Sequence, residues 1–194
     1  MTHARPLILA SASPRRADLL AAAGIAFDVV HADIDERARA SETPELYVSR
    51  VAEEKARAVS EQAPERFVLG ADTVVVVDGE ILGKPQDPAD ASRMLGMLSG
   101  RVHRVVSGVS LMRRCLPAVE TRVEVTVVEF TTWTTREIAW YVASGEPMGK
   151  AGAYAIQGLA SRFVTRVEGS YSNVVGLPVA VVYQMCTEAG LLLS

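Results

Sequence analysis

The chain has 194 residues, of which 49% are hydrophobic and 22% are charged, and its net charge at neutral pH is −3. Such a chain is globular and can bury its core as one domain or as two lobes that share a sheet. Because Lys and Arg form no block or tail, we expect no binding to duplex nucleic acid. No stretch reaches the roughly 20 apolar residues of a membrane span, and Leu7–Ala10 is too short for the core of a signal peptide, so we expect a cytoplasmic location.

The first apolar run, Leu7–Ala10, predicts a buried strand that a tight turn joins to a helix from Pro14 to about Ala23. Ser13 is a good N-cap, and the proline after it suits the first helical position, where no backbone donor is lost. The positive end of this helix, together with Arg15 and Arg16, is typical of a phosphate site. A capped helix with two solvated arginines explains the same residues equally well.

Later elements alternate between helical and extended patterns. In chain order the sequence first predicts a strand at Ile25–Val30, an acidic loop at His31–Ser41, a helix from Thr43 to about Gln62 and a short strand at Phe67–Leu69. A hairpin of Val74–Val77 and Ile81–Leu82 that turns at Asp78-Gly79 comes next, followed by a helix from Asp87 to about Leu98 and an antiparallel pair of strands at Arg101–Met112 and Val119–Thr131. The last predicted elements are a helix from Thr134 to about Ala143, a glycine-punctuated stretch at Lys150–Arg166 with extended residues around Phe163 and Val164, a loop at Gly169–Gly176, and a final helix from Pro178 to Gly190. This mixture predicts an α/β fold with a mixed sheet and helices on its faces.

The cysteine and histidine residues indicate no metal site of their own. Cys115 and Cys186 lie far apart in the sequence, so reduced thiols are a simpler expectation than a disulfide. His3, His31 and His103 lack the spacing of zinc ligands.

Two acidic positions are candidates for chemistry. Asp72 follows Gly70-Ala71, where we expect the buried strand to kink, and a carboxylate there could hold a metal ion or deprotonate water. The alternative is a strand-end acid bound to nearby N–H groups, and Thr73 beside it favours the functional interpretation. Glu36, with Asp33 and Asp35, could supply a second carboxylate to magnesium, although on sequence alone a solvated loop is the better interpretation.

Three further polar residues have open interpretations. Lys84 precedes a proline and is presented on an extended segment, where a point charge suits phosphate, but surface lysines are common. Lys55 lies close to the apolar stripe of its helix and could extend to the surface or point into a cleft. Gln157 could recognise a base edge, orient a water or satisfy a buried backbone group.

Several well-known catalytic motifs are missing from the sequence. There is no glycine loop followed by Lys-Ser/Thr, no GxSxG and no GxGxxG. Nucleophilic catalysis by Ser or Cys therefore has no support.

The segments LASASPRR, VAEEKA, GADTVV, VDGEILGKP, MLSGRVHRVVSGVSL, KAGAYAIQG and GSYSNVVGLPV, in this order, resemble the Maf family of nucleoside triphosphate pyrophosphatases. The resemblance runs from Leu7 to about Val182. It implies an elongated mixed sheet flanked by helices, with two lobes and a central cleft in one Maf-like domain, similar to the inosine triphosphatase (Maf/Ham1) architecture. It also implies hydrolysis of a nucleoside triphosphate to the monophosphate and pyrophosphate with a divalent cation, normally Mg²⁺, with Mn²⁺ as the alternative.

The resemblance also implies site residues. Asp72 matches the family's catalytic acid, Glu36 and Asp72 are the expected metal ligands, and the expected substrate-binding residues are Ser11, Arg15, Arg16, Lys55, Thr73, Lys84 and Gln157. GADT and AIQG resemble the branch that prefers dTTP and UTP, because the branch that prefers 7-methyl-GTP has a glutamine after the aspartate and an acidic residue near Gln157. Modified pyrimidine nucleotides and a house-cleaning role belong to the same expectation.

Two alternatives to this function stay open at the level of the sequence. One is a pyrophosphatase for 7-methyl-GTP or inosine triphosphate, and the other is a nucleotide-binding regulator of cell division without significant turnover. A homodimer is only what the family suggests.

Overall fold

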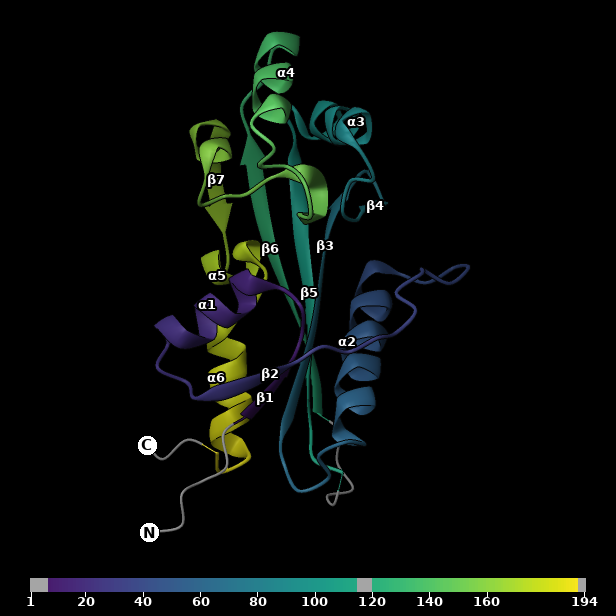
Figure 1. The fold of residues 1–194 in the computed structure, drawn as a ribbon. Coiled ribbons are helices and arrows are strands. Elements are labelled where there is room, and N and C mark those ends of the chain that lie inside the picture. The colour runs from purple at the N-terminus through teal and green to yellow at the C-terminus, as the bar shows by residue number, and fades with distance from the viewer. Residues whose placement is uncertain (1–6, 115–119, 192–194) are drawn as a thin grey trace. The chain divides into compact units, whose positions relative to one another are not determined.

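The computed structural model describes residues 7–114 and 120–191, which form a mixed α/β fold (Figure 1). Its elements are β1 (Leu7–Ala10), α1 (Pro14–Ala22), β2 (Phe27–Val30), α2 (Pro44–Ser60), β3 (Val68–Val77), β4 (Glu80–Leu82), α3 (Pro88–Leu98), β5 (Val102–Met112), β6 (Glu120–Phe130), α4 (Thr135–Ala143), the 3₁₀ turns η1 (Ala151–Ala153) and η2 (Leu159–Phe163), β7 (Val164–Glu168), α5 (Tyr171–Val175) and α6 (Val179–Glu188). The described chain divides into two compact units. Unit 1 holds residues 7–72, 107–114, 120–124 and 176–191, and unit 2 holds residues 73–106 and 125–175.

Within the described residues, the strands form a seven-stranded sheet in the order β2-β1-β3-β5-β6-β7, with β4 paired to β3 off this path. β1 is parallel to β2 and β3, whereas the β3–β4 and β6–β7 pairs are antiparallel. β5 and β6 are antiparallel as well. Thr121, near the start of β6, bonds Ser110, near the end of β5, whereas Phe130, at the end of β6, bonds Arg101, just before β5. The predicted mixed sheet is confirmed.

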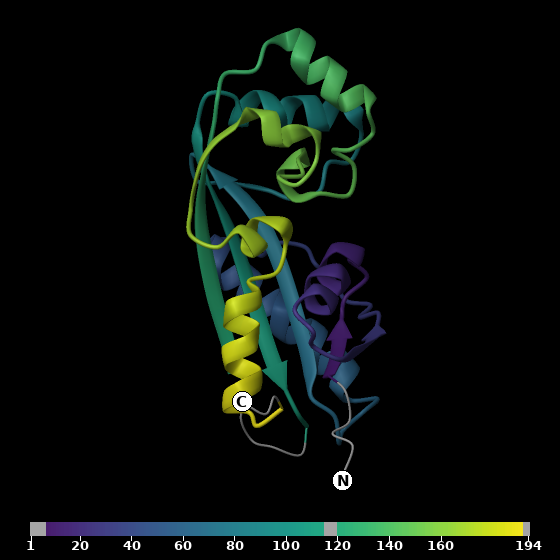
Figure 2. The same cartoon turned by 90° about the vertical axis from the view of Figure 1, so that its left-hand side faces the viewer.

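In unit 1, alternation of side chains along β1 builds a core on each face of the sheet. Leu7 and Leu9 pack in one cluster with residues of α1 and α6, and Ile8 and Ala10 pack in another with residues of α2. Figure 1 shows α2 on one side of these strands and α1 and α6 on the other, and the turned view has α6 in front of the sheet (Figure 2).

Glycines set how closely α2 approaches the sheet. A Cβ on Gly70 of β3 would lie 2.0 Å from the carbonyl oxygen of Ala52, and a Cβ on Gly108 of β5 would lie 2.3 Å from that of Val48. Since Val48 and Ala52 are one turn apart on α2, the helix backbone rests directly on two neighbouring strands. The predicted kink at Gly70-Ala71 is wrong, because β3 continues through this pair without a break and Gly70 serves helix packing instead.

Unit 2 has its own core, in which aromatic rings contact one another. The Trp133 and Phe163 rings stack with centroids 3.5 Å apart, and Phe130 meets Tyr154 edge to face at 4.9 Å. His103 Nε2 is 2.9 Å from the Tyr154 hydroxyl oxygen, and burial lowers the pKa of His103 to about 4. The imidazole is therefore neutral at pH 7 and is part of the core.

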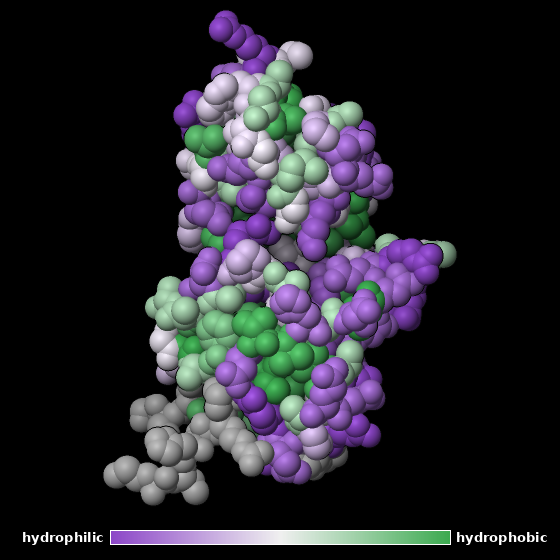
Figure 3. Space-filling model, in the orientation of Figure 1, coloured by the Kyte–Doolittle hydropathy of each residue, from purple (hydrophilic) through white to green (hydrophobic). Residues whose placement is uncertain are grey.

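β2 lies at one edge of the sheet and is shorter than predicted. Ile25, the expected first residue, is buried in the cluster that contains Leu20 of α1 rather than paired in the strand. Figure 3 shows apolar residues gathered on the face of unit 1 over β2, where Val29 is 46% exposed. A strand of only four residues offers a short edge for pairing with another chain.

Helix starts follow the predicted signals, with one difference in detail. Thr43 and Thr134 cap α2 and α4, and their side chains accept hydrogen bonds from backbone N–H groups. Ser13 occupies the N-cap of α1, but its hydroxyl makes no capping bond, and its own N–H donates to Ser11 Oγ at 3.1 Å.

The remaining predictions concern a hairpin turn and a loop. Asp78 and Gly79 have φ of +49° and +82°, as a tight hairpin turn requires, so the predicted hairpin is confirmed. The predicted loop at Gly169–Gly176 is wrong in part, because Tyr171–Val175 form the short helix α5.

Among the described residues, no helix combines the length and apolarity needed to cross a membrane. Cys186 of α6 carries a free thiol whose pKa is raised to about 11 by burial. Cys115 lies outside the described residues, so the expectation of reduced thiols stays a prediction for the pair.

Candidate functional site

A buried ammonium group lies between two carboxylates in unit 1. Lys55 Nζ, on α2, is 2.9 Å from Asp72 Oδ1 on β3 and 2.9 Å from Glu36 Oε1 on the loop between β2 and α2. Lys55 and Asp72 are 6% and 7% exposed, whereas the Glu36 side chain is 43% exposed. Of the two interpretations of Lys55, the structure supports the inward one.

This arrangement follows from local packing. Asp72 is two residues beyond Gly70 on β3, so both face α2. Lys55 lies three residues after Ala52, whose carbonyl oxygen occupies the space that a side chain at Gly70 would fill. Because the helix backbone is so close to the strand, the Lys55 side chain reaches the Asp72 carboxylate without leaving the core.

Arg16, on α1, is anchored by two hydrogen bonds and is only 8% exposed. Its Nε donates to the carbonyl oxygen of Gly176 at 2.9 Å, and its Nη1 donates to Ser11 Oγ at 3.2 Å. Burial lowers the pKa of the Arg16 guanidinium, while the negative charges of Asp72 and Glu36 oppose this shift. The Arg16 guanidinium is therefore a buried cation that two hydrogen bonds fix in place within electrostatic range of both carboxylates. It is not a solvated surface arginine.

Arg15 adds a second guanidinium beside the start of α1. It is half-buried, and burial lowers its pKa. The charges of Arg15, Glu36 and Asp72 thus all act on Arg16, and Lys55 joins the two carboxylates. These five side chains carry three positive and two negative charges, a net positive site that suits a polyphosphate.

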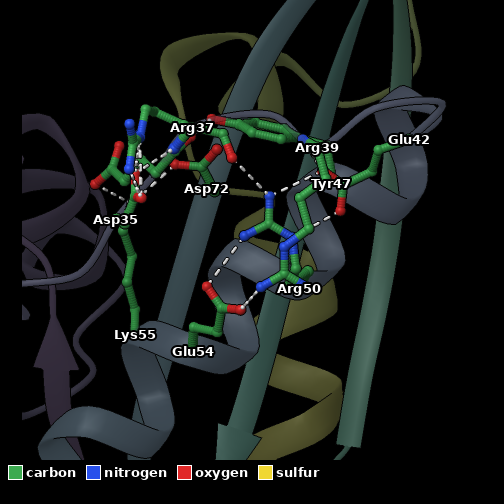
Figure 4. A network of polar contacts seen from close by, with 10 residues as sticks. Asp35, Arg37, Arg39, Glu42, Tyr47, Arg50, Glu54, Lys55 and Asp72 are labelled. Carbon is green, nitrogen blue, oxygen red and sulfur yellow. Dashed lines mark hydrogen bonds and ion pairs between the residues drawn. The ribbon is translucent and has the colours of Figure 1, made fainter.

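Tyr47 and Arg50 of α2 contact the same loop and were not predicted from the sequence (Figure 4). The Tyr47 hydroxyl donates to the backbone carbonyl of Glu36 at 2.8 Å. Burial raises the pKa of Tyr47, and the charges of Asp72 and Glu36 raise it further. A half-buried aromatic residue on a helix looks like an ordinary core residue in the sequence, so nothing there indicated this role.

The other three candidates belong to unit 2. Thr73 directly follows Asp72 on β3 and is partly buried. Lys84 is exposed and follows Gly83, whose carbonyl accepts a hydrogen bond from Gly152 N at 3.0 Å. Gln157 is exposed in the turn between η1 and η2. This exposure disfavours the interpretation in which its side chain is buried to satisfy a backbone group.

Glu146 frames the turn that carries Gln157, and it too was missed. Its carboxylate accepts hydrogen bonds from the Tyr141 hydroxyl at 2.8 Å and from Leu159 N at 3.0 Å. A Cβ on Gly158 would lie 2.2 Å from Glu146 Oε2, so any larger residue there would have to displace the carboxylate. The turn is therefore held by a carboxylate and not only by its own backbone.

Asp72 and Glu36 are the carboxylates of this site that a hard divalent cation would use. Asp72 Oδ1 and Glu36 Oε1 both contact Lys55 Nζ, so the two carboxylates lie on either side of one ammonium group. In the described part of the chain, no group of three or more His, Cys, Asp or Glu residues is arranged to hold a metal. Mg²⁺ commonly takes one or two carboxylates and completes its shell with water and substrate phosphates, so two carboxylates are sufficient.

Comparison with known proteins identifies the family of the chain. A profile of the family described as Maf-like protein matches residues 6–189. A dTTP/UTP pyrophosphatase of Koribacter versatilis (strain Ellin345) is 53% identical over 186 residues, covering 96% of this chain and 95% of that protein. The dTTP/UTP pyrophosphatase of Symbiobacterium thermophilum (strain DSM 24528 / JCM 14929 / IAM 14863 / T) is 52% identical over 184 residues, covering 95% of this chain and 94% of that one.

The fold has a relative among solved structures as well. The Ham1 protein of Staphylococcus aureus superposes with a TM-score of 0.50 at 14% identity, covering 95% of this chain and 100% of that one. This likeness concerns the fold alone and confirms the expected Ham1-like architecture. The family profile matches nearly the whole length and the relatives named above are about half identical, so the chain belongs to the Maf-like protein family.

Proposed function

We propose that this protein is a hydrolase that converts dTTP and UTP to their monophosphates and pyrophosphate. The observation that carries the proposal is the buried Lys55 between Asp72 and Glu36, with the anchored Arg16 in electrostatic range. Relatives about half identical in sequence bear the name dTTP/UTP pyrophosphatase. Modified pyrimidine triphosphates, and a house-cleaning role in the cytoplasm, are part of the same proposal.

The reaction joins the oxygen of a water molecule to the α-phosphorus and breaks the bond from that phosphorus to the oxygen bridging to the β-phosphate. Asp72 is the proposed proton acceptor, and Lys55 holds its carboxylate through Oδ1. Arg15 and Arg16 bind phosphate oxygens, and Ser11 keeps the Arg16 guanidinium in place. The leaving pyrophosphate takes the negative charge, which these cations stabilise.

Glu36 and Asp72 are the proposed ligands of a divalent cation, Mg²⁺ or Mn²⁺. When bound, the cation would neutralise charge on the phosphates. The two carboxylates support this proposal, because Mg²⁺ takes oxygen ligands and commonly binds one or two carboxylates. In unit 2, Thr73 and Gln157 are the proposed determinants of nucleotide choice, and Lys84 is a proposed phosphate ligand.

The test is release of pyrophosphate from dTTP, UTP, CTP, dGTP, ITP and 7-methyl-GTP, with magnesium and with chelator. We expect turnover of dTTP and UTP that the chelator abolishes. Turnover centred on 7-methyl-GTP or ITP would keep the chemistry and contradict the roles of Thr73 and Gln157. Tight nucleotide binding with no turnover would identify a regulator instead, and light scattering on the same preparation tests the homodimer.

Asp72→Asn tests the proton acceptor directly. We expect a native fold and a loss of about 10²- to 10⁴-fold in rate, which is what a general base commonly contributes. Asp78→Asn is the matched control, since Asp78 is an exposed turn residue directly after β3. If Asp72→Asn stays within a few fold of the control, Asp72 is not the base.

A further inference from the structure

Glu36 lies on a loop without helix or strand, and α2 holds that loop through two hydrogen bonds to its backbone. The Tyr47 hydroxyl donates to the carbonyl of Glu36 at 2.8 Å, and Arg50 Nη2 donates to the carbonyl of Arg37 at 3.1 Å. Carbonyls of consecutive residues are thus bound by side chains one helical turn apart. The backbone of Glu36 is therefore held independently of its own side chain.

Arg50 also binds the far end of the same loop. Its Nε and Nη2 donate to the two carboxylate oxygens of Glu42 at 2.7 and 2.8 Å, with the side chains only 13% and 9% exposed. The Arg50 guanidinium holds the pKa of Glu42 at about 2. Two parallel bonds between shielded groups give a more specific contact than an exposed ion pair does.

Glu54 completes the contact. It accepts hydrogen bonds from Arg50 Nη1 at 3.1 Å and from Arg39 Nη2 at 2.8 Å. Arg39 N donates to Glu42 Oε2 at 3.1 Å, so the loop is tied to itself at the point where Arg50 holds it. Figure 4 shows this network beside Lys55 and Asp72.

We infer that Tyr47 and Arg50 are positioning residues, which clamp the loop 36–42 to α2 so that the Glu36 carboxylate stays against Lys55. Tyr47, Arg50 and Glu54 are spaced i, i+3 and i+7 and share one face of α2. Lys55 is the next residue, so one helix supplies both the clamp and the ammonium group that Glu36 binds. The inference rests on the proposed function, in which Glu36 is a metal ligand.

The clamp has a physical reason. The Glu36 side chain is 43% exposed, and a single ion pair to such a side chain contributes little toward ordering a loop. Hydrogen bonds to two carbonyls and a shielded bidentate pair order the backbone before any ligand arrives. A metal ion that binds Glu36 then does not have to order the loop as well.

The first measurement is trypsin cleavage after Arg37 and Arg39, followed by mass spectrometry on the protein without nucleotide. Tyr47→Phe removes one hydroxyl and keeps the ring, and we expect cleavage to accelerate by about 5-fold, the effect of one lost hydrogen bond. Arg50→Gln should accelerate it more. Arg57→Gln is the matched control, because Arg57 pairs with Glu53 on the exposed part of α2 and should leave cleavage unchanged.

The second measurement separates positioning from simple stability. In Tyr47→Phe, the magnesium concentration for half-maximal hydrolysis of dTTP should rise by about 5-fold, with KM for dTTP at saturating magnesium unchanged. In a Glu36→Gln background, the same substitution should have no further effect on hydrolysis, because the group it positions has been changed.

Equal cleavage of Tyr47→Phe and the wild type overturns the inference. So does faster cleavage with an unchanged magnesium requirement, or a further loss of hydrolysis in the Glu36→Gln background, since either makes Tyr47 a merely structural residue. If the wild type hydrolyses no nucleotide, the proposed function fails, and the cleavage rates still decide whether these side chains hold the loop.

Discussion

Replacing Gly70 with alanine should separate α2 from the sheet and damage both stability and catalysis. The new Cβ would lie 2.0 Å from Ala52 O and 2.8 Å from Ala56 N, both backbone atoms that no side-chain rotation can move. Carbon–oxygen contacts settle at about 3.3–3.6 Å, so the Ala52 carbonyl must retreat by roughly 1.3 Å. Overpacking of this kind costs about 1–3 kcal/mol, and here the whole helix must move, so we expect the upper end of that range.

Urea unfolding measures the loss of stability, and the rate of dTTP hydrolysis at saturating magnesium reports on Lys55, which moves with α2. Gly96→Ala is the matched control, because a Cβ there meets nothing within 4 Å inside α3. That change should stabilise the protein by about 0.5–1 kcal/mol, as alanine does in an open helix. A Gly70→Ala protein as stable as the wild type would refute the close packing of α2 on β3.

Two further predictions concern unit 2. Burial lowers the pKa of His103 to about 4, from 6.5 in the unfolded chain. Between these two pH values the unfolded chain binds a proton at His103 and the folded chain does not, so stability falls as the pH drops from about 6.5 to about 4. The loss between pH 7 and pH 5 should be about 2 kcal/mol by urea unfolding, and a flat dependence there would contradict the burial of a neutral imidazole. Glu146→Gln should destabilise the protein by about 1–3 kcal/mol, because the amide cannot accept all the bonds that the carboxylate takes from Tyr141 and Leu159. Calorimetry measures this effect, and an unchanged unfolding temperature would mean that the turn before Leu159 does not depend on the carboxylate.

Much of the fold could be predicted because its signals are local. β1 has the bounds that its apolar run predicts, and α2 and α3 begin at prolines that follow a capping Thr43 and Asp87. The Asp78-Gly79 turn required two residues that tolerate positive φ, and the sequence has that pair. These features depend on a few neighbouring residues and not on tertiary contacts.

Features that depend on tertiary packing were predicted less well. Gly70 in a strand has two common explanations, a bend and a close backbone approach, and only the position of α2 distinguishes them. The helix α5 is five residues long and too short for a periodic pattern to identify it. The division into two compact units interrupts β3, β5 and β6, and no change of composition marks these points.

The candidate site shows the same contrast. Resemblance to a family indicated Lys55, Asp72 and Glu36, but the residues alone left Lys55 undecided, because its direction depends on how α2 rests on β3. Tyr47 and Arg50 act on backbone carbonyls of the loop, and such contacts have no pattern in a sequence.

Unit 1 is built from segments that are far apart in the sequence, and this affects how it folds during synthesis. Its core joins β1 and α1 from the start of the chain to Leu177, Val182 and Met185 near the other end, and Arg16 of α1 is bound by the carbonyl of Gly176. A nascent chain on the ribosome therefore cannot complete this core until α6 has emerged. Folding of unit 1 therefore waits for α6, and fragments released before that point lack both the core and the carbonyl that anchors Arg16. An incomplete chain would thus not act as a hydrolase on the cell's nucleotides.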